Sequence, residues 1–189
     1  TPDWVELTKD LAMSPTATPT NSGGAIPSGI IAEPSLVGHQ YGEGRSNSIA
    51  VDSNGVAHVV YFGGVHYDSL YYATNANGSW VTTMIKSPHP LMSNGASIVI
   101  DANDTIHISY SFRSNHGASL FYSTCSSSCS SVWSWSEVQV VAGGHYNNIA
   151  IDTNGTLHIS HGTTGTGSSL LQHSTCSSSC SIASSWTTT

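Results

Sequence analysis

The sequence has few charged residues. Asp, Glu, Lys and Arg make up only 8% of its 189 residues, and the formal net charge is −7. Lys and Arg together number 4, which is too few to follow the phosphate backbone of a nucleic acid. No apolar run reaches the ~18 residues that a transmembrane helix needs. We therefore expect neither a nucleic-acid partner nor a membrane span.

What the sequence does contain is one short phrase that occurs three times. Each copy is an apolar run that ends in Asp, a turn that contains Asn, and a second apolar stretch that contains His. The Asp residues are 49 and 51 residues apart, and a self-similar period near ~50 residues indicates a repeat architecture. The copies cover residues 48–61, 97–110 and 148–161, with the Asp at Asp52, Asp101 and Asp152.

Each repeat has the pattern of four short strands. In the first repeat, the nearly continuous apolar run at 48–52 suits a buried inner strand. The segment 53–55, Ser-Asn-Gly, supplies the residues that a tight hairpin turn needs. We expect the other strands at 56–62, 69–74 and 80–85. Four-stranded antiparallel units of about 40–50 residues are the blades of β-propellers.

The phrase Ser-Ile-Ala-Val-Asp-x-Asn-Gly-x-x-His-Ile-x-Tyr is followed by Leu-x-Tyr-x-Thr and then by Trp. Over residues 46–189 this pattern resembles the tandem repeats of bacterial secreted β-propellers, which are loosely similar to sialidase-like and lectin propellers. Residues 73–80 lie where those proteins carry an Asp-box, here a degenerate one with Asn in place of Asp. The resemblance implies a fold, whereas such folds host many functions.

We therefore expect an all-β protein with three propeller blades and an extra outer strand at its N-terminus. Propellers usually need about 4–8 blades, so the ring should be incomplete within these residues. A longer chain, several copies that complete the ring, or an open fibre would resolve the shortfall. The expected divisions are 1–12, an outer strand of a preceding or closing blade; 13–45, a linker loop rich in Pro, Ser, Thr and Gly; 46–95, blade 1; 96–147, blade 2; and 148–189, blade 3 with its fourth strand truncated.

Four cysteines occur in two Cys-Ser-Ser-Ser-Cys segments, which lie 51 residues apart, in register with the repeat. Zinc ligands usually lie within one small module, so we expect two local disulfides, with zinc as the alternative. Disulfides indicate an oxidising compartment, and a surface rich in Ser, Thr, Gly and Asn agrees with a secreted, extracellular protein. The expected pairs are Cys125 with Cys129 and Cys176 with Cys180.

The two ends of the predicted blades differ in composition. One end carries tight turns and the cysteine loops. The other carries most of the planar polar side chains, whose rings could stack on sugars while Arg, Asn and Asp bond hydroxyl groups; the alternative is that these loops are simply polar. The candidate ligand-binding residues are His39, Tyr41, Arg45, His66, Tyr67, Asp68, Arg113, His116, His145 and Tyr146.

Residues that recur in every repeat are expected to be structural, because equivalent positions in a repeat protein make equivalent packing contacts. We interpret the repeated Asp as a turn residue, with calcium binding as the alternative, and the repeated His as a buried hydrogen-bonding group. The tryptophans should fill the space between blades. We expect no metal and no cofactor. The residues are the three Asp named above, His58, His107, His158, Trp80, Trp135 and Trp186.

Three Asn-x-Ser/Thr sequons lie at the turn end, at Asn77, Asn103 and Asn154. They would be accessible acceptors for N-glycosylation. The alternative is that Asn-Gly turns followed by Thr create sequons by accident.

The function that these patterns favour is a secreted, non-catalytic propeller segment that binds a glycan or another extracellular ligand. One alternative is a structural or adhesive repeat protein that assembles into a fibre or coat. Another is part of a larger glycoside-active enzyme, for which Glu43 and Asp68 are the one conceivable carboxylate pair. Sialidases use three arginines to hold a carboxylate, whereas this sequence has only Arg45 and Arg113.

Overall fold

The computed structural model describes residues 44–64, 69–86, 93–114, 117–163 and 170–189. Within these residues the regular structure is almost entirely β-strand, arranged in three four-stranded antiparallel sheets. Two short 3-10 helices are present, and none of the described helices is long and apolar enough to span a membrane. The prediction of an all-β chain built from three blade-like sheets is confirmed.

The sheets follow the chain in order, and we call them blades 1, 2 and 3. Each one is a simple meander in which every strand pairs with the next. Blade 1 contains β1 (Arg45–Val51), β2 (Ala57–Gly63), β3 (Ser69–Thr74) and β4 (Val81–Lys86). Blade 2 contains β5 (Ser93–Ile100), β6 (Ile106–Ser114), β7 (Gly117–Cys125) and β8 (Ser136–Ala142). Blade 3 contains β9 (Gly144–Ile151), β10 (Leu157–Thr163), β11 (Leu171–Cys176) and β12 (Thr187–Thr188).

The strand boundaries differ from the sequence-based ones in three ways. The inner strand β1 begins at Arg45, three residues before the expected start at residue 48. The tryptophans stand just before the fourth strands rather than inside them, because in blades 2 and 3 a 3-10 turn, Val132–Ser134 or Ala183–Ser185, precedes the Trp. In addition, β6 and β7 pair as far as Ser114 with Gly117, so this hairpin is longer than expected.

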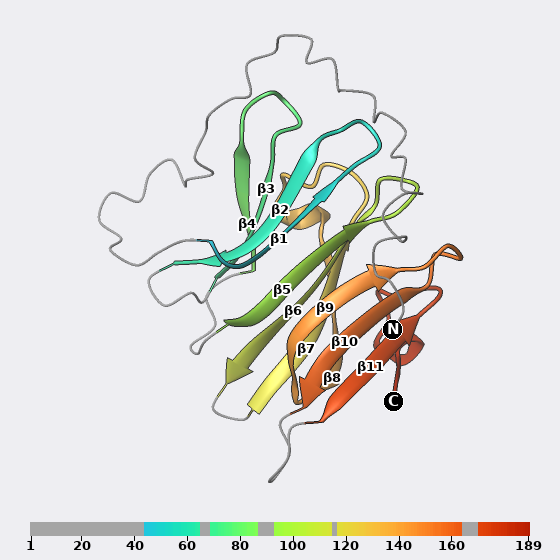
Figure 1. Cartoon of the computed structure of the whole chain (residues 1–189). Coiled ribbons are helices and arrows are strands. Elements are labelled where there is room, and N and C mark those ends of the chain that lie inside the picture. The colour runs from blue at the N-terminus through green and yellow to red at the C-terminus, as the bar shows by residue number, and fades with distance from the viewer. Residues whose placement is uncertain (1–43, 65–68, 87–92, 115–116, 164–169) are drawn as a thin grey trace, which may run out of the picture.

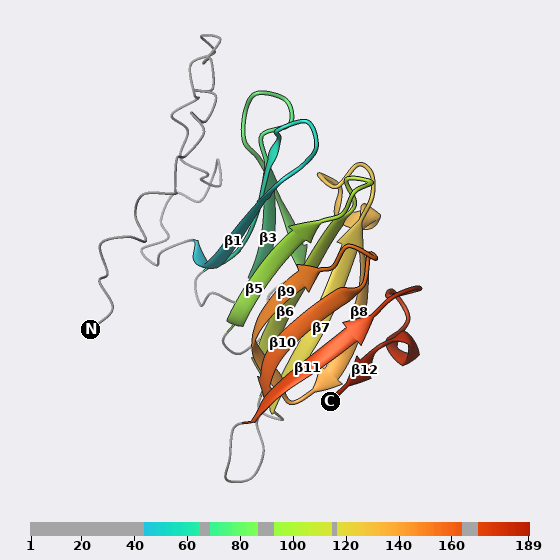
Figure 2. The same ribbon diagram turned by 45° about the vertical axis from the view of Figure 1, so that its right-hand side comes forward.

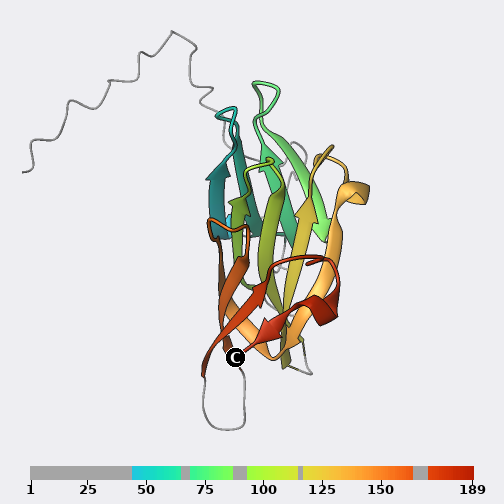
Figure 3. The same cartoon turned by 90° about the vertical axis from the view of Figure 1, so that its right-hand side faces the viewer.

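Blade 2 lies between blades 1 and 3, so the ring is open (Figure 1). The inner strands β1, β5 and β9 follow one another as neighbours, and the turns that follow them point to the same end of the molecule (Figure 2). In the view turned by 90°, blade 1 lies above blade 3, and blade 2 lies between them (Figure 3). This end is the turn end that the sequence predicts.

The repeated Asp builds the turn after each inner strand. Asp52 Oδ1 accepts the backbone N–H groups of Asn54 at 2.9 Å and Val56 at 2.8 Å. Asp101 and Asp152 make the same pairs of bonds in blades 2 and 3. These bonds fix the hairpin and therefore the register of the strands on either side.

Two apolar layers hold the blades together. The first, between blades 1 and 2, contains Val60, Phe62, Tyr72, Ile98 and Ile108. The second, between blades 2 and 3, is smaller and contains Leu120, Tyr122, Ile149, Ile159 and Trp186. Both layers arise because alternate residues of a strand point to opposite faces, so each central sheet face carries one apolar set.

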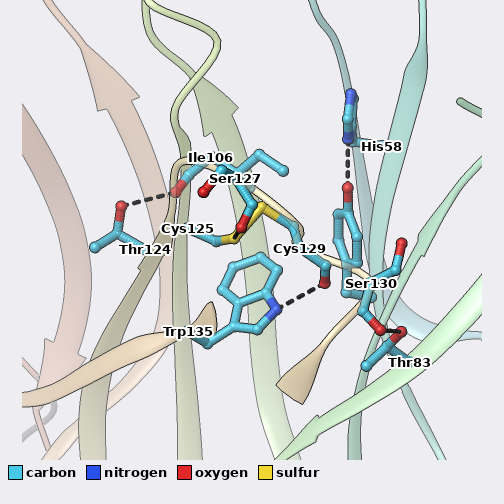
Figure 4. The surroundings of a disulfide bond; sticks show 10 residues. His58, Thr83, Ile106, Thr124, Cys125, Ser127, Cys129, Ser130 and Trp135 are labelled. Carbon is cyan, nitrogen blue, oxygen red and sulfur yellow. Dashed lines mark hydrogen bonds between the residues drawn. A yellow bond between two sulfur atoms is a disulfide. The ribbon is translucent and has the colours of Figure 1, made fainter. Parts of the chain in front are cut away.

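The cysteine loops present a tryptophan to the preceding blade. Cys125 is bonded to Cys129, and Trp135 Nε1 donates to the Cys129 carbonyl oxygen at 2.9 Å (Figure 4). The Trp135 ring then meets Tyr72 of blade 1 at 5.1 Å between centroids. Thr83 of blade 1 adds a bond from its hydroxyl to the Ser130 carbonyl oxygen. The sequence-based placement of this Trp between blades is therefore correct.

Blade 3 repeats this arrangement against blade 2. Cys176 is bonded to Cys180, and Trp186 Nε1 donates to the Cys180 carbonyl oxygen at 2.9 Å. The Trp186 ring meets Tyr122 at 5.2 Å between centroids. The same contact between a tryptophan and a tyrosine thus occurs at both junctions between blades.

Candidate functional site

The structure describes only part of the predicted ligand face. Arg45 and Arg113 lie in β1 and β6, but the structure describes only their backbone. His145 and Tyr146 are described in full and lie within β9 rather than in a loop. Glu43 falls outside the described residues. So do the remaining ligand-binding candidates, which are His39, Tyr41, His66, Tyr67, Asp68 and His116.

Tyr146 is displayed at a bulge at the start of β9. The pairing with β10 shifts between Ser160 and Gly162, and Tyr146 takes up the extra length with φ at +49°. This left-handed conformation is unfavourable for a bulky residue. The equivalent positions of blades 1 and 2 carry the smaller Ser46 and Gly95. As a result, the Tyr146 side chain projects outward and is 71% exposed.

His145 forms the floor beneath this tyrosine. Its ring meets the Tyr146 ring edge-on at 4.7 Å and is itself buried. The ring lies over Gly162, where an added Cβ would stand 3.1 Å from His145 Cε1. A larger residue at position 162 would therefore require the imidazole to move by a few tenths of an ångström, so the glycine allows His145 to pack closely against β10 beside the Tyr146 ring.

A second buried imidazole lies nearby on β10. His161 is fully buried, and its Nε2 is 2.9 Å from the Ser174 hydroxyl. Burial lowers the pKa of His161, and His145 and His173 add to this effect. Within the described residues, the Nδ1 atoms of His145 and His161 have no hydrogen-bond partner. His161 lies inside strand β10.

Asn147 ties the same bulge to blade 2. Its side-chain oxygen accepts the Ser109 hydroxyl at 2.6 Å, and its Nδ2 lies 3.1 Å from the Gly95 carbonyl oxygen and 3.3 Å from the Ser111 hydroxyl. Gly95 has φ at +124°, and a Cβ there would approach Asn147 Nδ2 to 3.4 Å. The backbone beneath Tyr146 is therefore fixed against blade 2. No spacing in the sequence signals this network.

A second arrangement, an Asp–His–Tyr series, recurs at the turn end. His58 Nδ1 is hydrogen-bonded to the Tyr72 hydroxyl at 2.6 Å, while its Nε2 lies 3.5 Å from Asp52 Oδ2, an electrostatic contact rather than a hydrogen bond. His107 and Tyr122 repeat it in blade 2 with Asp101. In blade 3 His173 replaces the tyrosine, and its Nε2 lies 3.0 Å from Nδ1 of His158.

These series resemble acid–base relays in composition, but those of blades 1 and 2 are buried, while that of blade 3 is partly exposed. His58, Tyr72, His107 and Tyr122 are each less than 10% exposed. Burial raises the pKa of Tyr72 and of Tyr122 to about 12. Burial lowers the pKa of His107. Because no substrate reaches these atoms, the geometry favours the packing role that repetition in every blade suggests.

A Lys–Glu–Tyr network between blades 1 and 2 was not foreseen. Lys86 Nζ lies 2.5 Å from Glu137 Oε1, and the Tyr110 hydroxyl donates to Glu137 Oε2. Burial, reinforced by the Glu137 carboxylate, raises the pKa of Tyr110 well above its usual value. Tyr110 is fully buried, so this Tyr–Glu pair does not offer a nucleophile to a ligand. Lys86 and Glu137 lie on the equivalent fourth strands β4 and β8, but they are not equivalent residues, because Lys86 pairs with Leu70 whereas the residue that pairs with the equivalent Leu120 is Val141.

The remaining candidate residues lie at the turn end. The side chains of Asn77, Asn103 and Asn154 are all exposed. Within the described residues, no group of three or more His, Cys, Asp or Glu could hold a metal ion.

No family model matches this sequence, and no curated protein matches it. The degenerate Asp-box resemblance therefore has no support from a sequence family. Solved structures do match, with low sequence identity.

An ulvan lyase from a polysaccharide lyase family is 12% identical over 75% of this chain, with a TM-score of 0.53. The same kind of lyase bound to -[GlcA(1-4)Rha3S]- gives 12% identity over 75% of this chain and a TM-score of 0.52. The chain spans 42% of the length of these lyases. A fucose lectin from Kordia zhangzhouensis in complex with methyl-fucoside is 14% identical over 76% of this chain and 96% of its own length, with a TM-score of 0.49. The likeness to the lyases shows a propeller-like fold.

Proposed function

We propose that this chain is a secreted, non-catalytic propeller segment that binds carbohydrate at the end opposite the turns. The observation that carries this proposal is Tyr146, a tyrosine held in a left-handed conformation and 71% exposed. A strained residue is retained where the surroundings fix it, and such residues cluster at binding sites. An exposed phenol ring offers an apolar face and a hydroxyl group, which suits stacking on a pyranose ring.

The support beneath the ring favours binding without a large rearrangement. His145 packs against Gly162, and Asn147 is bonded to three groups of blade 2. A ligand that stacks on Tyr146 therefore meets a surface whose shape is already fixed, and the entropic cost of binding is small.

Charge favours a neutral sugar over an acidic polysaccharide. The chain has 11 acidic residues against 4 Lys and Arg. One of these four, Lys86, is paired with Glu137. A protein with this net charge repels sulfated or uronate chains at low salt. Arg45 and Arg113 remain candidates for bonds to hydroxyl groups.

The carboxylates favour binding over hydrolysis. A glycosidase needs two facing carboxyl groups that are free to act on the substrate. Each acid in the described part of the chain is already bonded to backbone or side-chain groups of the protein. These acids are Asp52, Asp101, Asp104, Glu137 and Asp152. The two disulfides support secretion, because such bonds persist in oxidising compartments.

The test is a glycan array that includes neutral fucosides and uronate-containing oligosaccharides, followed by calorimetric titration of the best neutral ligand. The key variant is Tyr146→Ser, because Ser46 already occupies the equivalent left-handed position in blade 1. Loss of the ring should weaken binding at least about tenfold, which corresponds to ~1.4 kcal/mol.

The matched control is Trp133→Ser. Trp133 is 92% exposed but belongs to the 3-10 turn at the opposite end, so its removal should leave the affinity unchanged. The proposal fails if the folded chain retains no sugar. It also fails if Trp133→Ser weakens binding as much as Tyr146→Ser does.

A further inference from the structure

A histidine lies at the bulge that displays Tyr146. The pairing of β9 with β10 shifts so that His161 is the single residue of β10 opposite two residues of β9, Tyr146 and Asn147. In a bulge of this kind the two residues share one partner, and the bend of the strand depends on it. His161 is fully buried. A change in the position of His161 would therefore change how the exposed tyrosine is displayed.

Blade 2 places different residues at the equivalent positions. There the Tyr110 hydroxyl donates to the Glu137 carboxylate. In blade 3, His161 stands in place of Tyr110, and Thr188 stands in place of Glu137. His161 Nε2 lies 2.9 Å from the Ser174 hydroxyl, which in turn lies 2.7 Å from the Thr188 hydroxyl. Compared with blade 2, blade 3 thus has an imidazole but lacks the carboxylate that could stabilise a proton on it.

The other ring nitrogen of His161 lies close to apolar side chains. A Cβ added at Gly144 would stand 3.3 Å from His161 Nδ1, 2.7 Å from Leu120 Cβ and 3.1 Å from Val141 Cγ1. Within the described residues this Nδ1 has no hydrogen-bond partner. A protonated imidazole carries a donor on both nitrogens. In the present geometry the second donor would have no acceptor.

The charged and titratable groups around His161 also oppose its protonation. No carboxylate in the described part of the chain forms an ion pair with it. Burial lowers the pKa of His161, the Gly162 backbone opposes this shift, and His145 of β9 and His173 of β11 add to it. The neighbouring residues of β7, β8 and β12 named above carry no charge. A proton on His161 is therefore unfavourable while the bulge keeps its present form.

We propose that the site at Tyr146 releases its carbohydrate on acidification, with His161 as the residue that takes up the proton. This inference rests on the proposed function and adds a regulation of the same site. At neutral pH the imidazole is uncharged, and the bulge holds Tyr146 in its exposed, left-handed conformation. Below the ordinary histidine value of about pH 6.5, the proton is gained in a form of the bulge in which His161 has moved towards water. That movement withdraws the partner of Tyr146 and Asn147, and the stacking surface is lost.

The direction of the effect follows from linkage. A sugar that binds the intact bulge favours the form in which His161 is uncharged, so binding of the sugar and binding of the proton oppose each other. The affinity should therefore be complete above about pH 7 and should fall as the pH falls through the histidine range.

The test is calorimetric titration, at about pH 7.5 and about pH 5, of the neutral glycan that gives the strongest signal on the array. The dissociation constant of the wild-type chain should rise at least about fivefold at the lower pH, since one pKa unit of coupling corresponds to about tenfold. His161→Gln keeps a group that can bond the Ser174 hydroxyl but takes up no proton, so its dissociation constant should change by less than about twofold. Near-UV circular dichroism at both pH values checks that each chain is folded.

A second pair of variants adds a carboxylate instead of removing the imidazole. Thr188→Glu supplies the acid that Glu137 provides in blade 2, so a charged His161 gains a partner and the loss of affinity should shrink. Thr187→Glu is the matched control. It adds the same charge to the same strand, but Thr187 is exposed and points to the opposite face, so the full acid effect should remain.

Amide hydrogen exchange followed by mass spectrometry measures the bulge without a sugar. After correction for the intrinsic pH dependence of exchange, residues 144–151 of β9 should lose protection at about pH 5 relative to residues 93–100 of β5. His161→Gln should remove this difference. Equal protection of the two strands at both pH values overturns the inference.

The outcomes separate this inference from the proposed function. A wild-type affinity that does not change on acidification overturns the release alone, and so does an acid effect that persists in His161→Gln. If His161→Gln does not fold, equal acid effects in Thr188→Glu and Thr187→Glu overturn the release. A folded wild-type chain that retains no sugar at about pH 7.5 contradicts the proposed function, and the release with it.

Discussion

At the scale of single residues, a few polar groups lie among the apolar contacts between blades. Glu137 is the clearest example, because its two oxygens serve Lys86 of the neighbouring blade and the buried Tyr110 hydroxyl. The Lys86–Glu137 pair is only partly buried, so by itself it contributes little. The bond from the Tyr110 hydroxyl contributes more, since a buried donor that loses its acceptor costs about 1–3 kcal/mol.

We therefore expect Glu137→Ala to lower the free energy of unfolding by about 1–3 kcal/mol, measured by urea titration. In a Tyr110→Phe background the same substitution should cost less, because no hydroxyl is left without its carboxylate. Equal costs in the two backgrounds would show that the Tyr110 bond does not contribute to stability.

These residues could be predicted from the sequence to different degrees. That β4 lies near β8 could be expected, because a repeat fold brings equivalent strands side by side. The pairing of Lys86 with Glu137 could not, because the two residues are not at equivalent positions. The display of Tyr146 was not visible, because it depends on a bulge in β9 whose position is set by pairing with β10. The sign of φ and the exposure of a side chain at a bulge depend on tertiary contacts, so no local sequence pattern predicts them.

At the scale of elements, each cysteine loop holds its tryptophan in place through a hydrogen bond from the indole N–H to a carbonyl oxygen of the loop. The loop closes only a few residues, so the entropic model assigns each disulfide about 2 kcal/mol. The blade 2 loop has a further contact, the bond from Thr83 to the Ser130 carbonyl oxygen. At the position equivalent to Thr83, blade 2 presents Val138 to the blade 3 loop, and a valine side chain cannot donate such a bond.

The Cys125→Ser/Cys129→Ser variant should therefore lose more stability than the Cys176→Ser/Cys180→Ser variant, by about 1 kcal/mol for one hydrogen bond. Urea unfolding of both variants, followed by tryptophan fluorescence, measures the difference. An equal loss in the two variants would mean that the Thr83 contact adds nothing.

The elements themselves were the most predictable part of the fold. Alternating apolar residues and Asn-Gly turns predicted the second, third and fourth strands of blade 1 to within about one residue, because both signals are local. The inner strands begin three or four residues earlier than expected, because their first residues pair across a bulge. The short 3-10 turns before Trp135 and Trp186 were missed, since they depend on the indole bond to the Cys129 and Cys180 carbonyl oxygens. The openness of the ring followed from the repeat count alone.

At the scale of the whole molecule, titratable groups spread over all three blades set the pH range of stability. Burial lowers the pKa of His107 and, with His145 and His173, that of His161 below the ordinary 6.5. The Val56 and Thr156 N–H groups lower the pKa of Asp52 and Asp152 below 3.8. At Asp101 burial opposes the shift, but the Thr105 and Asn103 N–H groups outweigh it.

The sign of each effect follows from linkage. A group whose pKa is lower in the folded state contributes stability above its unfolded pKa and loses it as the pH falls through the folded value. Stability should therefore decline as the pH falls below about 6.5, because of the two histidines, and again below about 4, because of the three aspartates. Tyr72 and Tyr122, with pKa values raised to about 12 by burial, act in the opposite sense. Their contribution is complete below pH 10 and is lost as the pH rises towards 12.

The free energy of unfolding should thus be nearly constant from about pH 7 to pH 10 and fall on both sides, as urea titrations across this range would measure. His107→Gln keeps a polar side chain at the same place without a titrating group, so the decline that begins near pH 6.5 should shrink in this variant. His158→Gln is the control, since it removes the equivalent imidazole of blade 3, whose side chain is 34% exposed. A decline near pH 6.5 that persists unchanged in His107→Gln would place its origin outside the blade 2 series.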